Sequence, residues 1–144
     1  HLIQGWTQYW NKILKPVDPL DIDLVKALIA SESSFNPSAW NGIKGPNRAR
    51  GLMQVLDRSV QYLKDDFPEL HNHFINLSED DMLDSNLSIC AGIRWLFRKK
   101  QLREAKLKRA ITWREAVAGY KSIKPNDGLM KKFDKYFKEL KGEK

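Results

Sequence analysis

The clearest apolar pattern in the chain belongs to a predicted helix that ends near Ser33. One face of this helix carries three aliphatic residues and one carboxylate at i, i+3, i+4 and i+7 spacing: Val25, Leu28, Ile29 and Glu32. The helix is expected to stop before Pro37, because the residue that precedes a proline is biased away from the α region. The pattern therefore directs Glu32 toward the core of the protein.

Further helical patterns cover most of the chain. They comprise an N-terminal aromatic stripe, a segment from Leu56 to Phe67, a helix from about Ser85 to Lys100 and a C-terminal amphipathic helix with a lysine-rich face. Gly92 in the middle of the Ser85 helix predicts close packing against another backbone there. Thr112 and Glu115 have capping-box spacing and predict the start of a further helix. No segment shows sustained period-two alternation, so the sequence predicts an all-α fold. The N-terminal stripe has the regular spacing of core packing rather than of a sugar-binding surface: Trp6, Tyr9, Trp10, Ile13, Leu14 and Val17.

The segment from Ser38 to Arg50 is rich in turn residues and is predicted to be a loop. Trp40 within it has two equally good interpretations, stacking on a sugar ring or covering the core. After the loop, Gly51 is expected to allow a close backbone approach, either to a substrate or to the Glu32 helix. Gln54 offers a donor and acceptors that suit sugar hydroxyls and N-acetyl groups.

Glu32 is the strongest candidate for chemistry. Poor solvation disfavours the charged form of a carboxyl group, so its pKa should rise and the group should hold a proton near neutral pH. A general acid has this requirement. The alternative is a structural role, in which Glu32 turns to solvent or pairs with one of the many Lys and Arg side chains.

Composition and charge restrict the class of protein. The chain has 144 residues, of which 42% are apolar and 30% charged, which fits one folded domain and excludes a disordered chain. No apolar run approaches the roughly 20 residues of a membrane-spanning helix. The net charge of +7 favours polyanionic partners, either nucleic acid or the anionic polymers of a bacterial envelope. The basic run from Lys99 to Arg109 is interpreted as a solvated helix end and linker, with an anion-binding patch as the alternative.

Cysteine and histidine usage predicts neither a disulfide nor a metal site. Cys90 is the single cysteine and lies in an apolar helical run, where it is expected to pack as a small hydrophobic residue. His71 and His73 are two residues apart and do not share a helical face, so no metal and no other cofactor is predicted. The chain begins at His1 rather than Met, the pattern of a mature form or an excised domain, so any signal or anchor would lie outside it.

Two motifs resemble those of a known enzyme family. Glu-Ser-Ser-Phe-Asn-Pro at 32–37 and Gly-Leu-Met-Gln-Val at 51–55 are similar to the signature of the soluble lytic transglycosylases of glycoside hydrolase family 23, which also contains the goose-type lysozymes. Residues 88–96 resemble the family's second-half helix, and Ala116-Val117-Ala118-Gly119-Tyr120 resembles its A-x-A-x-Y-N element. Lys121 replaces the Asn that normally follows the tyrosine, and the loop before Gly51 is a few residues longer than usual.

The resemblance implies a lysozyme-like fold, and its motifs lie at about 24–122. Periodicity alone predicts the flanking amphipathic helices at 1–20 and 126–141, and residues 1–144 are expected to form a single domain. It implies cleavage of the β-1,4 bond between N-acetylmuramic acid and N-acetylglucosamine, with Glu32 as general acid and then base and a 1,6-anhydro product. Substrate would be held by Ser34, Met53, Gln54 and Tyr120, with Trp40 as a further candidate. Lys121 is a candidate contact for a peptide-stem carboxylate.

Two alternative functions stand beside this prediction. A hydrolysing muramidase of goose-lysozyme type would need a second carboxylate, for which Asp57 is a candidate, although an Asp at that place usually caps the following helix. A basic helical module that binds glycan or nucleic acid without catalysis is the second, but no nucleic-acid recognition motif supports nucleic acid. The expected partner is peptidoglycan, acted on by a monomer in the periplasm or cell envelope.

Overall fold

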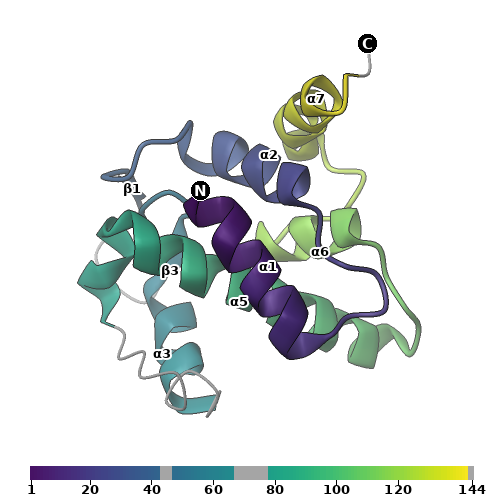
Figure 1. Ribbon diagram of the computed structural model, residues 1–144, viewed down its shortest axis with the longest axis horizontal. Helices are drawn as coiled ribbons and strands as arrows, with labels where there is room; N and C mark the ends of the chain where they lie inside the picture. The colour runs from purple at the N-terminus through teal and green to yellow at the C-terminus, as the bar shows by residue number, and fades with distance from the viewer. Residues whose placement is uncertain (43–46, 67–77, 143–144) are drawn as a thin grey trace.

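Helices make up most of the molecule (Figure 1). The computed structural model describes residues 1–42, 47–66 and 78–142. The α-helices are α1 (Leu2–Leu14), α2 (Ile22–Ser33), α3 (Asp57–Asp66), α5 (Ser85–Leu107), α6 (Trp113–Tyr120) and α7 (Lys131–Leu140). Two short 3₁₀ helices are η1 (Glu79–Leu83) and η2 (Gly128–Met130). The predicted lysozyme-like, mostly helical fold is confirmed.

The first half of α5 forms the centre of the core. Its residues from Ser88 to Phe97 are all buried, and the helix packs against α1, α3 and α6. Trp10 of α1 donates its indole N–H to the carbonyl oxygen of Cys90 at 3.0 Å. The Cys90 side chain is buried as predicted, and burial raises the pKa of its thiol to about 12. None of the described helices is long and apolar enough to cross a membrane.

A small antiparallel sheet with strand order β1-β2-β3 follows α2 in the chain. Its strands are β1 (Trp40–Asn41), β2 (Ala49–Arg50) and β3 (Val55–Leu56), with Trp40 opposite Arg50 and Arg50 opposite Val55. This sheet was not predicted, because a strand of two residues is too short to show alternation. It brings the chain after α2 back beside the C-terminal end of that helix.

Two predicted boundaries differ from the structure. The N-terminal stripe does not extend to Val17, because α1 ends at Leu14 and Lys15 adopts a left-handed conformation with φ 47°. Val17 is consequently fully exposed instead of packing in the core. The basic run beyond Lys99 is mostly helical rather than a linker, since α5 continues to Leu107.

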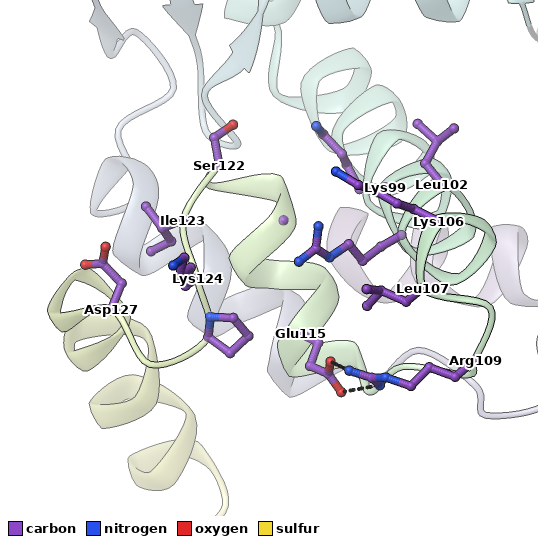
Figure 2. A pocket seen from close by; sticks show the side chains of 13 residues that line it. Lys99, Leu102, Lys106, Leu107, Arg109, Glu115, Ser122, Ile123, Lys124 and Asp127 are labelled. Carbon is purple, nitrogen blue, oxygen red and sulfur yellow. Dashed lines mark hydrogen bonds and ion pairs between the residues drawn. The ribbon is translucent and has the colours of Figure 1, made fainter.

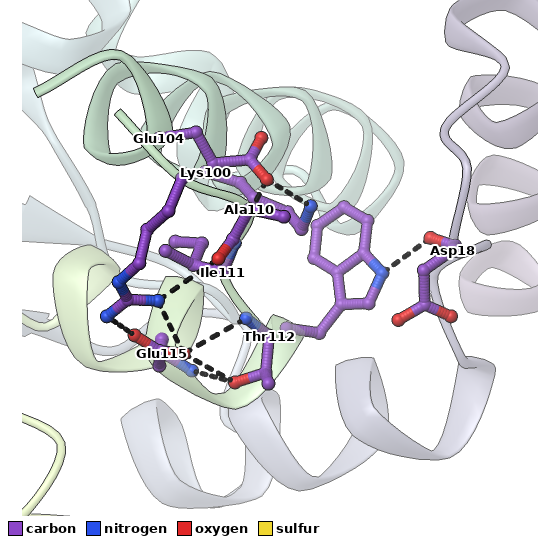
Figure 3. A network of polar contacts seen from close by, with 9 residues as sticks. Asp18, Lys100, Glu104, Ala110, Ile111, Thr112 and Glu115 are labelled. Atoms are coloured by element: carbon purple, nitrogen blue, oxygen red, sulfur yellow. Dashed lines mark hydrogen bonds and ion pairs between the residues drawn. The ribbon is translucent and has the colours of Figure 1, made fainter. Parts of the chain in front are cut away.

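Polar contacts between α5 and α6 fix where α6 begins (Figure 3). The predicted capping box is confirmed: the Thr112 hydroxyl accepts the Glu115 backbone N–H at 3.1 Å, and the Glu115 carboxylate accepts the Thr112 N–H at 3.2 Å. Glu104 of α5 accepts the backbone N–H of Ile111 at 3.1 Å. Because α6 is anchored at its start, the residues at its end, Tyr120 and Lys121, are held in place.

Candidate active site

Glu32 lies in the last turn of α2 and lines a cleft of about 830 Å³. Its side chain is 17% exposed, so the carboxylate is mostly shielded from water but reachable from the cleft. The other walls come from the small sheet, the C-terminal end of α6, η2 and the first residues of α7. A carboxylate at the wall of an open, partly dry cleft is a candidate for acid–base chemistry.

Lys121 is the closest partner of Glu32. Its ammonium lies 2.9 Å from Glu32 Oε1 and donates to the Ser31 hydroxyl at 2.8 Å. The Lys121 side chain is 11% exposed, so this ion pair is largely shielded from solvent. Lys121 was expected to contact a carboxylate of the substrate, whereas here it holds a carboxylate of the protein.

The environment of Glu32 shifts its proton equilibrium in two opposite directions. Burial raises the pKa of the carboxyl group, while the charge and hydrogen bond of Lys121 and the charge of Lys132 lower it by less. The balance leaves the pKa above its ordinary value. Glu32 therefore holds its proton to a higher pH than an exposed glutamate does, as the sequence pattern predicted.

Tyr120 lines the cleft beside Glu32 and is hydrogen-bonded to the backbone of Met53. The Tyr120 hydroxyl donates to the Met53 carbonyl oxygen at 2.5 Å, and burial together with the nearby Glu32 charge raises the tyrosine pKa. Tyr120 lines the cleft. Met53 was expected to do so too, but its side chain is 0% exposed and lies in the core, so only its backbone is directed toward Tyr120.

The Met53 side chain fills the space that Gly92 leaves on α5. A Cβ added at Gly92 would lie 2.5 Å from Met53 Sδ and 2.7 Å from Met53 Cβ. The close packing expected at Gly92 is therefore with a side chain. Gly51 also allows a close approach, but not to a substrate or to the Glu32 helix as predicted. It has φ +78°, and an added Cβ would lie 1.7 Å from the Met82 carbonyl oxygen of η1.

Gln54 lines the cleft, yet its amide has a structural role as well. The residue has a left-handed backbone conformation with φ 48°, and its side-chain N–H₂ donates to the carbonyls of Ala39 at 3.1 Å and Gly51 at 2.9 Å. These two bonds use both amide donors and tie the start of β3 to the segment before β1. The acceptor oxygen is the part of Gln54 left for a sugar group.

Trp40 and Ser34 lie outside the residues that line the cleft. Trp40 is 60% exposed in β1, and the guanidinium of Arg48 lies 4.6 Å from its ring centroid. This exposure removes the alternative in which Trp40 covers the core. Ser34 ends α2 in a left-handed conformation, and its hydroxyl lies 3.5 Å from Lys132 Nζ.

Asp57 does not accompany Glu32. It is the first residue of α3, and its two oxygens accept from Arg50 Nε at 2.9 Å and Nη2 at 3.1 Å. It lines a different cavity, together with Arg50 and residues of η1. Among the described residues that line the Glu32 cleft, none besides Glu32 is an Asp or Glu.

Ser31, Arg58 and Lys132 are among the cleft residues that were not predicted. Ser31 could have been noticed beside Glu32, but its bond to Lys121 joins residues 90 positions apart. Lys132 lies in α7, which packs against α2, and no local sequence pattern predicts this packing. His71 and His73 lie outside the described residues. The part of the chain that is described holds no group of three or more His, Cys, Asp or Glu side chains that could bind a metal.

The mostly helical fold and the acid-bearing cleft define a protein of the lysozyme-like class. A family model described as the transglycosylase SLT domain matches residues 11–141, and the chain belongs to this family. Searches of curated proteins and of solved structures found no match. Membership of the family supports a lytic transglycosylase-type function on peptidoglycan. Proteins with an SLT domain act on peptidoglycan in the periplasm or envelope.

Proposed function

We propose that this protein is a lytic transglycosylase that cleaves the β-1,4 bond between N-acetylmuramic acid and N-acetylglucosamine and releases 1,6-anhydro-muropeptides. The observation that carries the proposal is the buried Glu32 carboxyl, with its raised pKa, in a cleft open to a polymer. The cleft-lining Gln54 and Tyr120 would contact the glycan, and Ser34 and the exposed Trp40 are candidates for contacts beyond the cleft.

In the first step, Glu32 acts as general acid. Its proton passes to the bridging oxygen as the bond between that oxygen and C1 of the muramic acid breaks. Positive charge develops at C1, and the substrate's own acetamido group helps to stabilise it. The ionised Glu32 that remains is stabilised by the Lys121 ammonium, which is already 2.9 Å from Oε1.

In the second step, the Glu32 carboxylate acts as general base. It takes the proton from the C6 hydroxyl of the same muramic acid, and the C6 oxygen closes onto C1 to give the 1,6-anhydro ring. Glu32 is protonated again at the end of the cycle, so proton balance is restored without water. Lys121 thus favours the base form needed here, while burial favours the acid form needed in the first step.

The number of carboxylates in the described cleft lining supports transglycosylation rather than hydrolysis. A hydrolase that activates water commonly uses a second Asp or Glu. The described lining of the cleft offers no such group beside Glu32, and Asp57 is held by Arg50 at another cavity. The intramolecular attack by the C6 hydroxyl needs one carboxylate, which is what the described cleft provides.

Mass spectrometry of digested, purified sacculi tests the proposal. Anhydro-muropeptides are the expected product of the wild-type protein, and Glu32→Gln should release them about 10²–10⁴-fold more slowly because it removes the transferable proton. If all products carry reducing ends, the protein is a hydrolysing muramidase and not a transglycosylase. Equal wall clearance by the wild type and Glu32→Gln would show that Glu32 is not the acid.

A second candidate function is a glycan-binding module without catalytic activity. The observation that favours it is the Glu32–Lys121 ion pair, because Lys121 stands where the family has Asn and stabilises the deprotonated form of the acid. In that case neither the wild type nor Glu32→Gln would cleave sacculi, while both would sediment with them. Lys121→Asn is then the informative variant. If the protein is a binding module because Lys121 replaces the family's Asn, this variant should restore cleavage.

The setting we propose follows from the substrate. The protein would act as a monomer on glycan strands in the periplasm or cell envelope, with no cofactor and with no nucleic acid as a partner. Residues 1–144 would form one catalytic domain, in which 24–122 carries the motifs and 1–20 and 126–141 contribute flanking helices. The family match to 11–141 covers half of the first flank and all of the second.

A further inference from the structure

A second cavity, the α5–α6 groove, lies between the C-terminal half of α5, helix α6 and the segment from Ser122 to Asp127 (Figure 2). Its volume is about 760 Å³, close to that of the Glu32 cleft. Lys99, Leu102, Lys106 and Leu107 lie along the α5 side in Figure 2, and Ile123 and Lys124 lie on the opposite side. None of the proposed catalytic steps uses this groove.

The groove contains cations that have no acidic partner. Lys99, Arg103, Lys106 and Lys124 line it, and none of them forms an ion pair within the described chain. The lowered pKa of Lys99 has two causes, burial first and the nearby positive charge of Arg58 second. A partly buried ammonium that faces another cation favours the binding of an anion.

The acids of the groove are already occupied. The carboxylate of Glu115 accepts from Arg109 at 2.9 Å and from the Thr112 backbone. The carboxylate of Asp127 accepts the backbone N–H of Leu129 at 2.8 Å and caps η2. These contacts leave a net excess of uncompensated positive charge along the α5 side.

The groove also has an apolar floor with room for a ligand. Leu102 and Leu107 are 45% and 37% exposed, although both line the cavity together with Ile123 and Pro125. Gly119 of α6 lines the same space, and a Cβ added there would meet no atom within 4 Å. Aliphatic side chains could therefore lie against α6 between the cations.

The α5–α6 groove adjoins the Glu32 cleft. Ser122 and Ile123 line both. A third cavity of about 410 Å³ borders both as well, because it shares Tyr120 with the cleft and Lys99 and Leu102 with the groove. The groove therefore lies within reach of a side branch on a polymer held at Glu32.

We propose that the α5–α6 groove binds a short acidic peptide, namely the peptide stem of a glycan strand that occupies the Glu32 cleft. This identity of the peptide rests on the proposed function. Stem peptides carry several carboxylates and small aliphatic side chains, which match the unpaired cations and the apolar floor. Nucleic acid fits less well, because the described lining of the groove has no aromatic side chain on which a base could stack.

Direct binding is the first test. The probe is the tripeptide L-alanyl-γ-D-glutamyl-meso-diaminopimelate, and its fully amidated form, which carries no carboxylate, is the comparison. Binding is measured by calorimetry on the full chain. Saturable binding of the acidic form is expected, and Arg103→Gln with Lys106→Gln should weaken it about threefold to tenfold, the range for two solvent-accessible ion pairs. The matched control is Lys135→Gln with Lys138→Gln on the exposed side of α7, which should leave the affinity unchanged.

A variant that fills the groove gives a second test. Gly119→Leu places a side chain into open space, so the helix should fold, while the floor of the groove becomes blocked. The KM for stem-bearing strands should rise at least threefold, whereas the KM for strands stripped of stems by an amidase should stay constant. Gly5→Leu is the control, because Gly5 is a helical glycine of α1 with equally open surroundings away from the groove.

The outcomes separate this proposal from the proposed function. Equal binding of the acidic and amidated peptides, or unchanged affinity in the Arg103/Lys106 variant, overturns the groove as an acidic-peptide site. So does a single-stranded oligonucleotide that binds more tightly than the peptide and is weakened by the same variant. If the peptide binds as expected but the wild type cleaves no glycan, the catalytic proposal fails and the peptide site stands.

Discussion

Glu32 and Asp57 are two shielded carboxylates with opposite surroundings. Their side chains are 17% and 15% exposed, and each is paired with one main cation, Lys121 or Arg50. Arg50 holds both oxygens of Asp57 with two of its N–H groups, a fork geometry that a guanidinium favours. Lys121 holds one oxygen of Glu32, and the other accepts no hydrogen bond from a described residue.

The difference shows that two carboxylates with similar exposure can have different surroundings and different roles. A bidentate Arg–carboxylate pair is held in a fixed geometry, and Arg50 also binds Asp80. The three side chains therefore join β2, α3 and η1 into one structural cluster. Glu32 has one flexible partner, faces a large cleft and has a raised pKa. It can therefore exchange a proton with a ligand, whereas Asp57 serves the fold.

The largest expected effect is on catalysis by Glu32. Glu32→Gln should lower kcat/KM on purified glycan strands by about 10²–10⁴-fold, the contribution of a general acid–base group. Asp57→Asn, the matched control, should change kcat/KM by less than about tenfold, since Asp57 lines another cavity. A loss of similar size in both variants would mean that Asp57 takes part in the reaction.

The free energy of unfolding should depend on Asp57, the carboxylate that matters less for catalysis. Asp57→Asn leaves the Arg50 guanidinium with a poorer partner and should lower the free energy of unfolding by about 1–3 kcal/mol. Urea denaturation measures this value. Asp134→Asn on the more exposed Arg114–Asp134 pair is the control and should cost about 0–1 kcal/mol. Equal losses would contradict a special structural role for the Arg50–Asp57 pair.

The pH dependence of activity tests the role of Lys121. The basic limb of the kcat/KM profile reflects loss of the Glu32 proton, and Lys121 lowers the pKa of Glu32 through its charge and its hydrogen bond. Lys121→Met removes both contributions, so the pKa should rise further and the basic limb should move to higher pH. Lys131→Met is the control, because Lys131 lines the cleft but has no part in the Glu32 shift. A basic limb that stays in place would assign that limb to another group.

Removing the charge of Lys132 should also move the basic limb of the kcat/KM profile to higher pH, but by less. Its charge lowers the pKa of Glu32 without a hydrogen bond and by less than Lys121 does. Lys132→Met should therefore move the basic limb upward, but less than Lys121→Met. A shift larger than that of Lys121→Met would reverse the ranking of the two lysines and identify Lys132 as the main electrostatic partner.

Sequence patterns predicted the parts of the molecule that depend on local order. The helix that carries Glu32, its end at Ser33 and the Thr112–Glu115 capping box follow from spacing and from cap chemistry within a few residues. The contact between Lys121 and Glu32 joins residues 89 positions apart and depends on how the end of α6 meets the end of α2. The burial of the Met53 side chain likewise depends on Gly92, a neighbour that no pattern around Met53 encodes.

The position of Cys90 has a consequence for redox chemistry. Its thiol is fully buried beneath α1, and a pKa of about 12 leaves almost no thiolate at physiological pH. Thiolate is the form that attacks disulfides and is oxidised, so this cysteine is inert in the folded state. The domain is therefore expected to behave alike in oxidising and reducing surroundings, and to need no reductant during storage.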